Sequence, residues 1–188
     1  MIKCEVRILS IGYGLVGLGG IAKTHLLGLR NIPLLGLPID EKIKLKGLYT
    51  THPLKYSELA SSIGFENVVG TIEELVKIPE LDMVDICTPN FLHSEQIKIA
   101  AQACKHIYCE KPLSIDRHTA LEAVKAVEEA SVFNQVAFVL RFLHSVARAH
   151  SLLKHKVVGK VFNFRAELYH SSYINQKRPI TWRLQKEE

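Results

Sequence analysis

A chain of 188 residues has room for one complete domain and the beginning of a second, because domains usually contain about 100 to 150 residues. The composition is 47% hydrophobic and 23% charged, and no apolar run approaches the roughly 20 residues of a membrane-spanning helix, so a membrane protein is not expected. Lys and Arg outnumber Asp and Glu by 24 to 19 but are scattered, which argues against the clustered basic face of a nucleic-acid-binding protein.

The first residues do not resemble a secretory signal peptide, because Glu5 and Arg7 interrupt the apolar stretch that such a peptide needs. We therefore expect a cytoplasmic protein. The four cysteines, at positions 4, 87, 104 and 109, form no CxxC pair and are expected to be reduced thiols, and we predict no metal site.

Apolar, β-branched runs alternate with helical patterns along residues 1–142. The expected strands are 8–16, 43–49, 83–87, 106–109 and 136–142, and the expected helices are 21–29, 54–63, 94–104 and 116–130. Thr71 and Glu74 form a capping box before a short helix, and Pro79 is expected to stop that helix. This alternation predicts an α/β fold, a Rossmann domain with a doubly wound parallel sheet.

Residues 143–188 are expected to begin a second domain, of α+β type. The pattern predicts a helix over 146–154 and a strand over 161–169, followed by a polar tail. Because a lone strand needs partners, we expect this second domain to be incomplete.

A glycine-rich turn follows the first expected strand, and two overlapping patterns compete for it. They are Gly12-x-Gly14-x-x-Gly17 and Gly17-x-Gly19-x-x-Ala22. A pyrophosphate site needs a strand before the first glycine and a helix that opens at the third position, and the second pattern meets both conditions. The candidate cofactor-binding residues here are therefore Gly17, Gly19, Gly20, Ile21 and Ala22; the alternative is a plain turn.

The residues after the second expected strand bear on the choice of dinucleotide. An acidic residue usually holds the adenosine ribose at this point, but the sequence reads Thr50, Thr51 and His52, with Lys55 close behind. Without a carboxylate to repel a 2′-phosphate, NADP is favoured over NAD, although both stay open. Alternatively, Thr50 and Thr51 simply end a strand.

Two further polar segments follow the expected strands 83–87 and 106–109, at the sheet edge where ligands bind in open α/β folds. Together with the glycine turn they resemble, in order and spacing, the glucose-fructose oxidoreductase, inositol dehydrogenase and rhizopine-catabolism (Gfo/Idh/MocA) oxidoreductase family. The matching segments are Val16-Gly17-Leu18-Gly19-Gly20-Ile21-Ala22-x-x-His25, Thr88-Pro89-Asn90-x-x-His93 and Cys109-Glu110-Lys111-Pro112-Leu113, with Arg141-Phe142 and Gly159-Lys160-Val161 as later landmarks.

This resemblance implies an NAD(P)-dependent oxidoreductase that moves a hydride between a nicotinamide and a hydroxyl-bearing carbon of a sugar, inositol or related polyol. It implies that Lys111 transfers the proton or positions the substrate oxygen, since a lysine can take or return that proton. The remaining candidate cofactor-binding residues are Thr88, Pro89, Asn90, His93, Glu110, Lys111 and Arg141. The alternatives are a solvated loop lysine for Lys111 and an ordinary helix-start residue for His93.

The sequence also departs from the family. The resemblance implies that residues 143–188 begin a domain that binds the substrate and forms the dimer interface. It also implies a glycine-rich segment followed by an aspartate and a histidine in that domain, and this chain stops before them; Cys104 stands where the family commonly has glycine. We expect the 188 residues alone to be inactive and the full-length protein to be a homo-oligomer. The alternative function is a non-catalytic dinucleotide-binding module or a shortened homologue without the catalytic segment.

Overall fold

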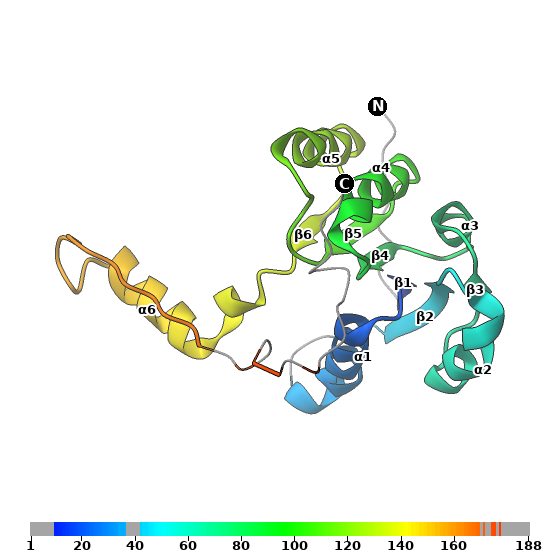
Figure 1. Cartoon of the computed structure of the whole chain (residues 1–188), viewed down its shortest axis with the longest axis horizontal. Coiled ribbons are helices and arrows are strands. Elements are labelled where there is room, and N and C mark those ends of the chain that lie inside the picture. Colours follow the sequence, from blue (N-terminus) through cyan, green and yellow to red (C-terminus); the bar gives the residue numbers. More distant parts are fainter. Residues whose placement is uncertain (1–9, 37–41, 170, 172–173, 176, 178–188) are drawn as a thin grey trace. The chain divides into compact units, whose positions relative to one another are not determined.

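The computed structural model describes residues 10–36, 42–169, 171, 174–175 and 177 (Figure 1). The chain divides into two compact units, Met1–Ala137 and Phe138–Glu188. The first unit contains the sheet and every predicted site residue except Arg141. The predicted functional boundary at residues 142–143 lies slightly beyond the boundary between the compact units and stays a prediction.

Six parallel strands form one sheet in the order β3-β2-β1-β4-β5-β6. Their bounds are β1 Ser10–Val16, β2 Lys42–Tyr49, β3 Val68–Val69, β4 Met83–Ile86, β5 His106–Cys109 and β6 Asn134–Val136. The order runs outward from β1 in one direction through β2 and β3, and in the other through β4, β5 and β6. This arrangement confirms the predicted Rossmann fold with a doubly wound parallel sheet.

Helices cover both faces of the sheet. Their bounds are α1 Gly20–Asn31, α2 Pro53–Ile63, α3 Ile72–Val76, α4 His93–Gln102 and α5 Arg117–Ala130, with 3₁₀ turns at Ile32–Leu35 (η1) and Asn90–Leu92 (η2). One core cluster joins α1 and α2 to β1 and β2, and the other joins α3, α4 and α5 to β4 and β5. Figure 1 shows α4 and α5 on one side of the sheet and α1 on the other.

Local sequence signals account for the ends of several elements. The predicted capping box is present at α3: Thr71 Oγ1 accepts a hydrogen bond from the Glu74 amide, and the Glu74 carboxylate accepts one from the Thr71 amide. Pro53 begins α2, and Gly64 ends it with φ of 108°, a conformation that favours glycine.

The structure decides between the two glycine patterns. Gly12 and Gly14 lie inside β1, and a Cβ on Gly12 would come within 1.7 Å of the Glu80 carbonyl oxygen. Gly12 and Gly14 therefore allow close packing. The pattern that starts at Gly17 instead lies where β1 ends and α1 begins, as predicted.

Two predicted strands are wrong in whole or in part. The strand expected over 136–142 ends at Val136, and the chain then forms a 3₁₀ turn, Val139–Phe142 (η3). Residues 161–169 were expected to form a strand, but they have no strand pairing in the described part of the chain. A β-strand needs a neighbouring backbone to satisfy its amides and carbonyls, and apolar alternation alone does not supply one.

The helix predicted over 146–154 is present as α6, His144–Lys154, in the second unit. Among the described residues, no helix has both the length and the apolar character that a bilayer crossing requires.

Candidate functional site

The turn between β1 and α1 exposes a helix N-terminus. Gly17 has φ of 89°, its amide donates to the Tyr49 carbonyl at 2.9 Å, and a Cβ there would lie 3.1 Å from Thr88 Cγ2. Gly19 is the N-cap of α1, no side chain caps the helix, and a Cβ on Gly19 or Gly20 would meet nothing within 4 Å. Uncapped amides beside open space fit a pyrophosphate, which binds to helix N-termini.

The other two residues of the glycine pattern differ in exposure. Ile21 is partly exposed on the first turn of α1, while Ala22 is fully buried against the sheet. Ala22 therefore allows α1 to pack closely against β1 and β2, which is the packing role that a small residue has at this position.

The segment after β4 is held to the segment after β5 by a buried histidine. His93 is 1% exposed; its Nδ1 lies 2.9 Å from the Pro112 carbonyl oxygen and its Nε2 lies 2.9 Å from the Thr88 carbonyl oxygen. Because a carbonyl oxygen only accepts hydrogen bonds, a ring N–H donates to at least one of the two carbonyls. The ring thus joins the two loops that carry the predicted site residues, while Pro89 and Asn90 remain partly exposed between them.

Glu110 and Lys111 lie at the end of β5. The Glu110 carboxylate is 5% exposed, and its Oε2 accepts a hydrogen bond from the Lys111 amide at 3.1 Å. Lys111 Nζ lies 3.7 Å from the same oxygen, and the Lys111 side chain is 52% exposed. The carboxylate therefore orients the lysine backbone, and the half-exposed side chain places Nζ where a substrate oxygen could meet it.

A buried polar cluster lies beside Glu110, on the face of the sheet that α1 covers. Asp85 of β4 accepts hydrogen bonds from the Tyr13 hydroxyl at 2.5 Å and from the Cys87 thiol at 3.4 Å, and His25 Nδ1 lies 2.8 Å from its Oδ2. The hydrogen bond to Asp85 raises the pKa of His25, although burial opposes this shift. Burial and the nearby Asp85 charge raise the pKa of both the Tyr13 hydroxyl and the Cys87 thiol.

Sequence reasoning did not select Tyr13 or Asp85. The available signal was Asp85 itself, a carboxylate within the otherwise apolar strand Met83–Ile86. One nitrogen of His25, one Asp85 oxygen and the Cys87 sulfur lie within 4.8 Å of one another, as metal ligands would. The same side chains are already joined to one another, since the Cys87 thiol donates to Asp85 Oδ1 and Asp85 Oδ2 lies 2.8 Å from His25 Nδ1, and we interpret the cluster as a hydrogen-bond network.

The residues after β2 divide into a buried and an exposed set. The Thr50 hydroxyl accepts from the His52 amide at 3.3 Å, and the Thr50 amide donates to the Val69 carbonyl, so Thr50 completes a turn. Thr51, His52 and Lys55 instead line an open cavity of about 460 Å³. A ribose or a ribose phosphate would therefore meet these three residues before Thr50.

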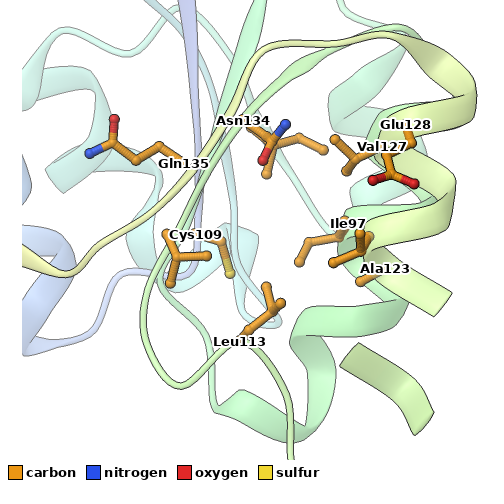
Figure 2. Close-up of a pocket in the computed structure, with 11 residues that line it drawn as sticks. Ile97, Cys109, Leu113, Ala123, Val127, Glu128, Asn134 and Gln135 are labelled. Atoms are coloured by element: carbon orange, nitrogen blue, oxygen red, sulfur yellow. The ribbon is translucent and has the colours of Figure 1, made fainter. Parts of the chain in front are cut away.

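Arg141 and an apolar cavity of the first unit are two further features. Arg141 belongs to the second unit, where its guanidinium lies 5.5 Å from the Phe138 ring, and its cofactor contact stays a prediction. A cavity of about 170 Å³ lies among side chains of α4, α5, β5 and β6 (Figure 2). It is lined mainly by apolar residues such as Ile97 and Val127, so it offers little to a charged dinucleotide.

Comparisons with known proteins agree with the geometry. The family described as "Oxidoreductase family, NAD-binding Rossmann fold" (Gfo/Idh/MocA) matches residues 11–138. Levoglucosan dehydrogenase of Pseudarthrobacter phenanthrenivorans is 31% identical over 94% of this chain and 45% of its own length. Myo-inositol 2-dehydrogenase of Thermotoga maritima is 27% identical over 78% of this chain and 42% of its own length.

A solved structure of levoglucosan dehydrogenase in complex with NADH and levoglucosan has a TM-score of 0.75 and 32% identity to this chain. The similarity covers 80% of this chain and 41% of that structure. The chain therefore spans less than half the length of these relatives.

Proposed function

The chain belongs to the Gfo/Idh/MocA oxidoreductase family, and on this premise we propose that it is the cofactor-binding part of an NAD(P)-dependent oxidoreductase. Its substrate would be a sugar, inositol or related polyol, oxidised at a hydroxyl-bearing carbon. The observation that carries the proposal is the uncapped N-terminus of α1 at the same edge of the sheet as Glu110 and Lys111.

The residues present suggest a separate role for each part of the site. When bound, the nicotinamide supplies the hydride acceptor or donor. The amides of Gly19 and Gly20 bind the pyrophosphate, and His93 keeps the loops after β4 and β5 at a constant separation. Lys111 Nζ takes the hydroxyl proton as the carbon is oxidised and returns it in the reverse reaction.

NAD(H) is the cofactor that the family description and the NADH complex of levoglucosan dehydrogenase support. We propose that this chain slightly favours NADP over NAD, as the sequence predicts. Thr51, His52 and Lys55 face an open cavity and present no carboxylate to a 2′-phosphate. Calorimetry with both dinucleotides tests this; NADP binding weaker than NAD binding by more than tenfold would reject the predicted preference.

The decisive experiment for the catalytic role uses Lys111→Ala in a protein extended through the second domain. We expect kcat to fall about a hundredfold or more, the usual contribution of a general acid or base, while dinucleotide affinity stays nearly unchanged. Lys125→Ala is the matched control, because Lys125 is an exposed lysine on α5 that pairs only with Glu129 among the described residues.

The outcome separates the candidate functions. An unaltered kcat in Lys111→Ala would remove Lys111 from the mechanism. If the unchanged extended protein binds NAD but oxidises no polyol, the alternative holds, and the protein is a non-catalytic dinucleotide-binding module.

We also propose that the full-length protein is cytoplasmic and forms a homo-oligomer. Light scattering on the extended protein tests the second point, since a monomeric mass at micromolar concentration would contradict it.

A further inference from the structure

The proposed mechanism leaves one histidine, His25 of α1, without a role, although it lies between two carboxylates. Three neighbouring parallel strands place Tyr13, Asp85 and Glu110 toward the same face of the sheet, and His25 of α1 lies between the two carboxylates. Side chains two positions apart on a strand share a face, so Tyr108 and Cys87 also lie beside this histidine.

Asp85 determines the orientation of the His25 ring. Its Oδ2 lies 2.8 Å from His25 Nδ1 and accepts the Tyr13 hydroxyl at 2.5 Å, while its Oδ1 accepts the Cys87 thiol. Asp85 is 2% exposed, so these contacts are shielded from water and hold the ring firmly. The raised pKa of His25 agrees with a cationic ring between the two acids.

The second nitrogen of the ring faces Glu110. His25 Nε2 lies 3.3 Å from Glu110 Oε1, but the alignment does not make a hydrogen bond, and Nε2 is buried without another partner among the described residues. The other oxygen of the same carboxylate accepts the Lys111 amide and lies 3.7 Å from Lys111 Nζ. Glu110 therefore lies between His25 and the candidate catalytic lysine.

A carboxylate that is almost fully buried is costly unless a nearby cation compensates it. Lys111 is half exposed and lies at the longer distance, so His25 is the buried partner that keeps Glu110 in place. Catalytic contacts that are poorly aligned in a ligand-free protein often tighten when the ligands bind. His25 Nε2 lies 3.3 Å from Glu110 Oε1, so a small reorientation of either group would form a hydrogen bond between them.

We propose that His25, anchored by Asp85, is a positioning residue that holds the Glu110 carboxylate toward Lys111 and so orients Lys111 for proton transfer. This inference rests on the proposed function. The groups around His25 are Tyr13 on β1, Asp85 on β4 with Cys87 directly after that strand, and Tyr108 on β5 with Glu110 directly after it.

Two substitutions of His25 test the contacts of its two ring nitrogens separately. In His25→Gln the terminal amide can reach the place of Nε2 and donate to Glu110, whereas in His25→Asn it can reach only the place of Nδ1 and bind Asp85. In the extended protein we expect His25→Asn to lower kcat at least tenfold, and His25→Gln to recover most of that loss. The KM for NAD should change less than threefold in both.

The control is His106→Gln, at the opposite end of β5, where the histidine accepts a hydrogen bond from the Phe133 amide. It should leave kcat within twofold. Equal losses in His25→Asn and His25→Gln, or no loss in either, would overturn the inference, because contact with Glu110 would then not matter.

A spectroscopic measurement on the 188-residue chain does not depend on turnover. With ¹³C-labelled lysine, the Lys111 Cε signal should shift in His25→Asn and stay unchanged in His106→Gln. If the extended wild type oxidises no polyol, the proposed function fails, and this shift alone decides whether His25 acts on Lys111. An unchanged Lys111 signal in His25→Asn would overturn the inference about His25. If the extended wild type is active, the proposed function would still hold.

Discussion

Replacing Gly19 by alanine tests whether the turn before α1 holds a pyrophosphate. Gly19 has φ of −76° and ψ of −174°, an extended conformation that alanine adopts without strain. A Cβ there meets no protein atom within 4 Å, so the free protein should tolerate it. The methyl group would instead occupy the space in which a phosphate approaches the first amides of the helix.

The expected effect on stability is small. A strain-free Gly→Ala change stabilises by about 0.4 to 1 kcal/mol because the unfolded chain loses conformational freedom, but alanine is a poorer N-cap than glycine by a comparable amount, so the two contributions oppose each other. Loss of one hydrogen bond to a charged phosphate costs about 1.5 to 3 kcal/mol. Since every 1.4 kcal/mol corresponds to a factor of ten, the Kd for NAD should rise about ten- to a hundredfold.

Gly12→Ala provides the matched comparison, because its Cβ would lie 1.7 Å from the Glu80 carbonyl oxygen and 3.1 Å from Leu81 Cα. Backbone atoms must move, so this variant should lose at least about 1 to 3 kcal/mol of stability. Calorimetry with NAD and urea unfolding measure the two quantities. If Gly19→Ala binds NAD as tightly as the unchanged chain, the assignment of the pyrophosphate to this turn is wrong.

Three further outcomes concern stability and reactivity. The pKa of His25 is raised above its unfolded value of about 6.5, chiefly by the hydrogen bond to Asp85. The stability that this interaction contributes is therefore fully present below about pH 6.5 and is lost as the pH rises through the folded pKa. Urea unfolding should show this decline in the unchanged chain and not in His25→Gln. Thr71→Ala should lower the free energy of unfolding by about 1 kcal/mol, and Thr71→Ser should leave it nearly unchanged, because serine keeps the cap of α3. Iodoacetamide should alkylate the partly exposed Cys104 before the buried Cys87 and Cys109, as peptide mass analysis would detect; faster labelling of Cys87 would contradict its burial and raised pKa.

Local sequence signals determined much of this protein. Alternating strand and helix patterns predicted the Rossmann sheet, and Thr71 with Glu74 predicted the start of α3. The requirement for a strand before and a helix after the glycine turn selected Gly17 and Gly19 over Gly12 and Gly14. These features depend on residues close together in the chain, so their physical causes are visible in the sequence.

Other features depend on which segments meet in space. Apolar alternation over 161–169 predicted a strand, but pairing requires a partner that the local pattern cannot reveal. His25 meets Asp85 across 60 residues of sequence, and Tyr13 meets Asp85 across 72. Only the parallel order of β1, β4 and β5 brings these groups to one face of the sheet, beside Glu110 and Lys111, so the tertiary structure alone decided that a buried histidine lies next to the candidate catalytic lysine.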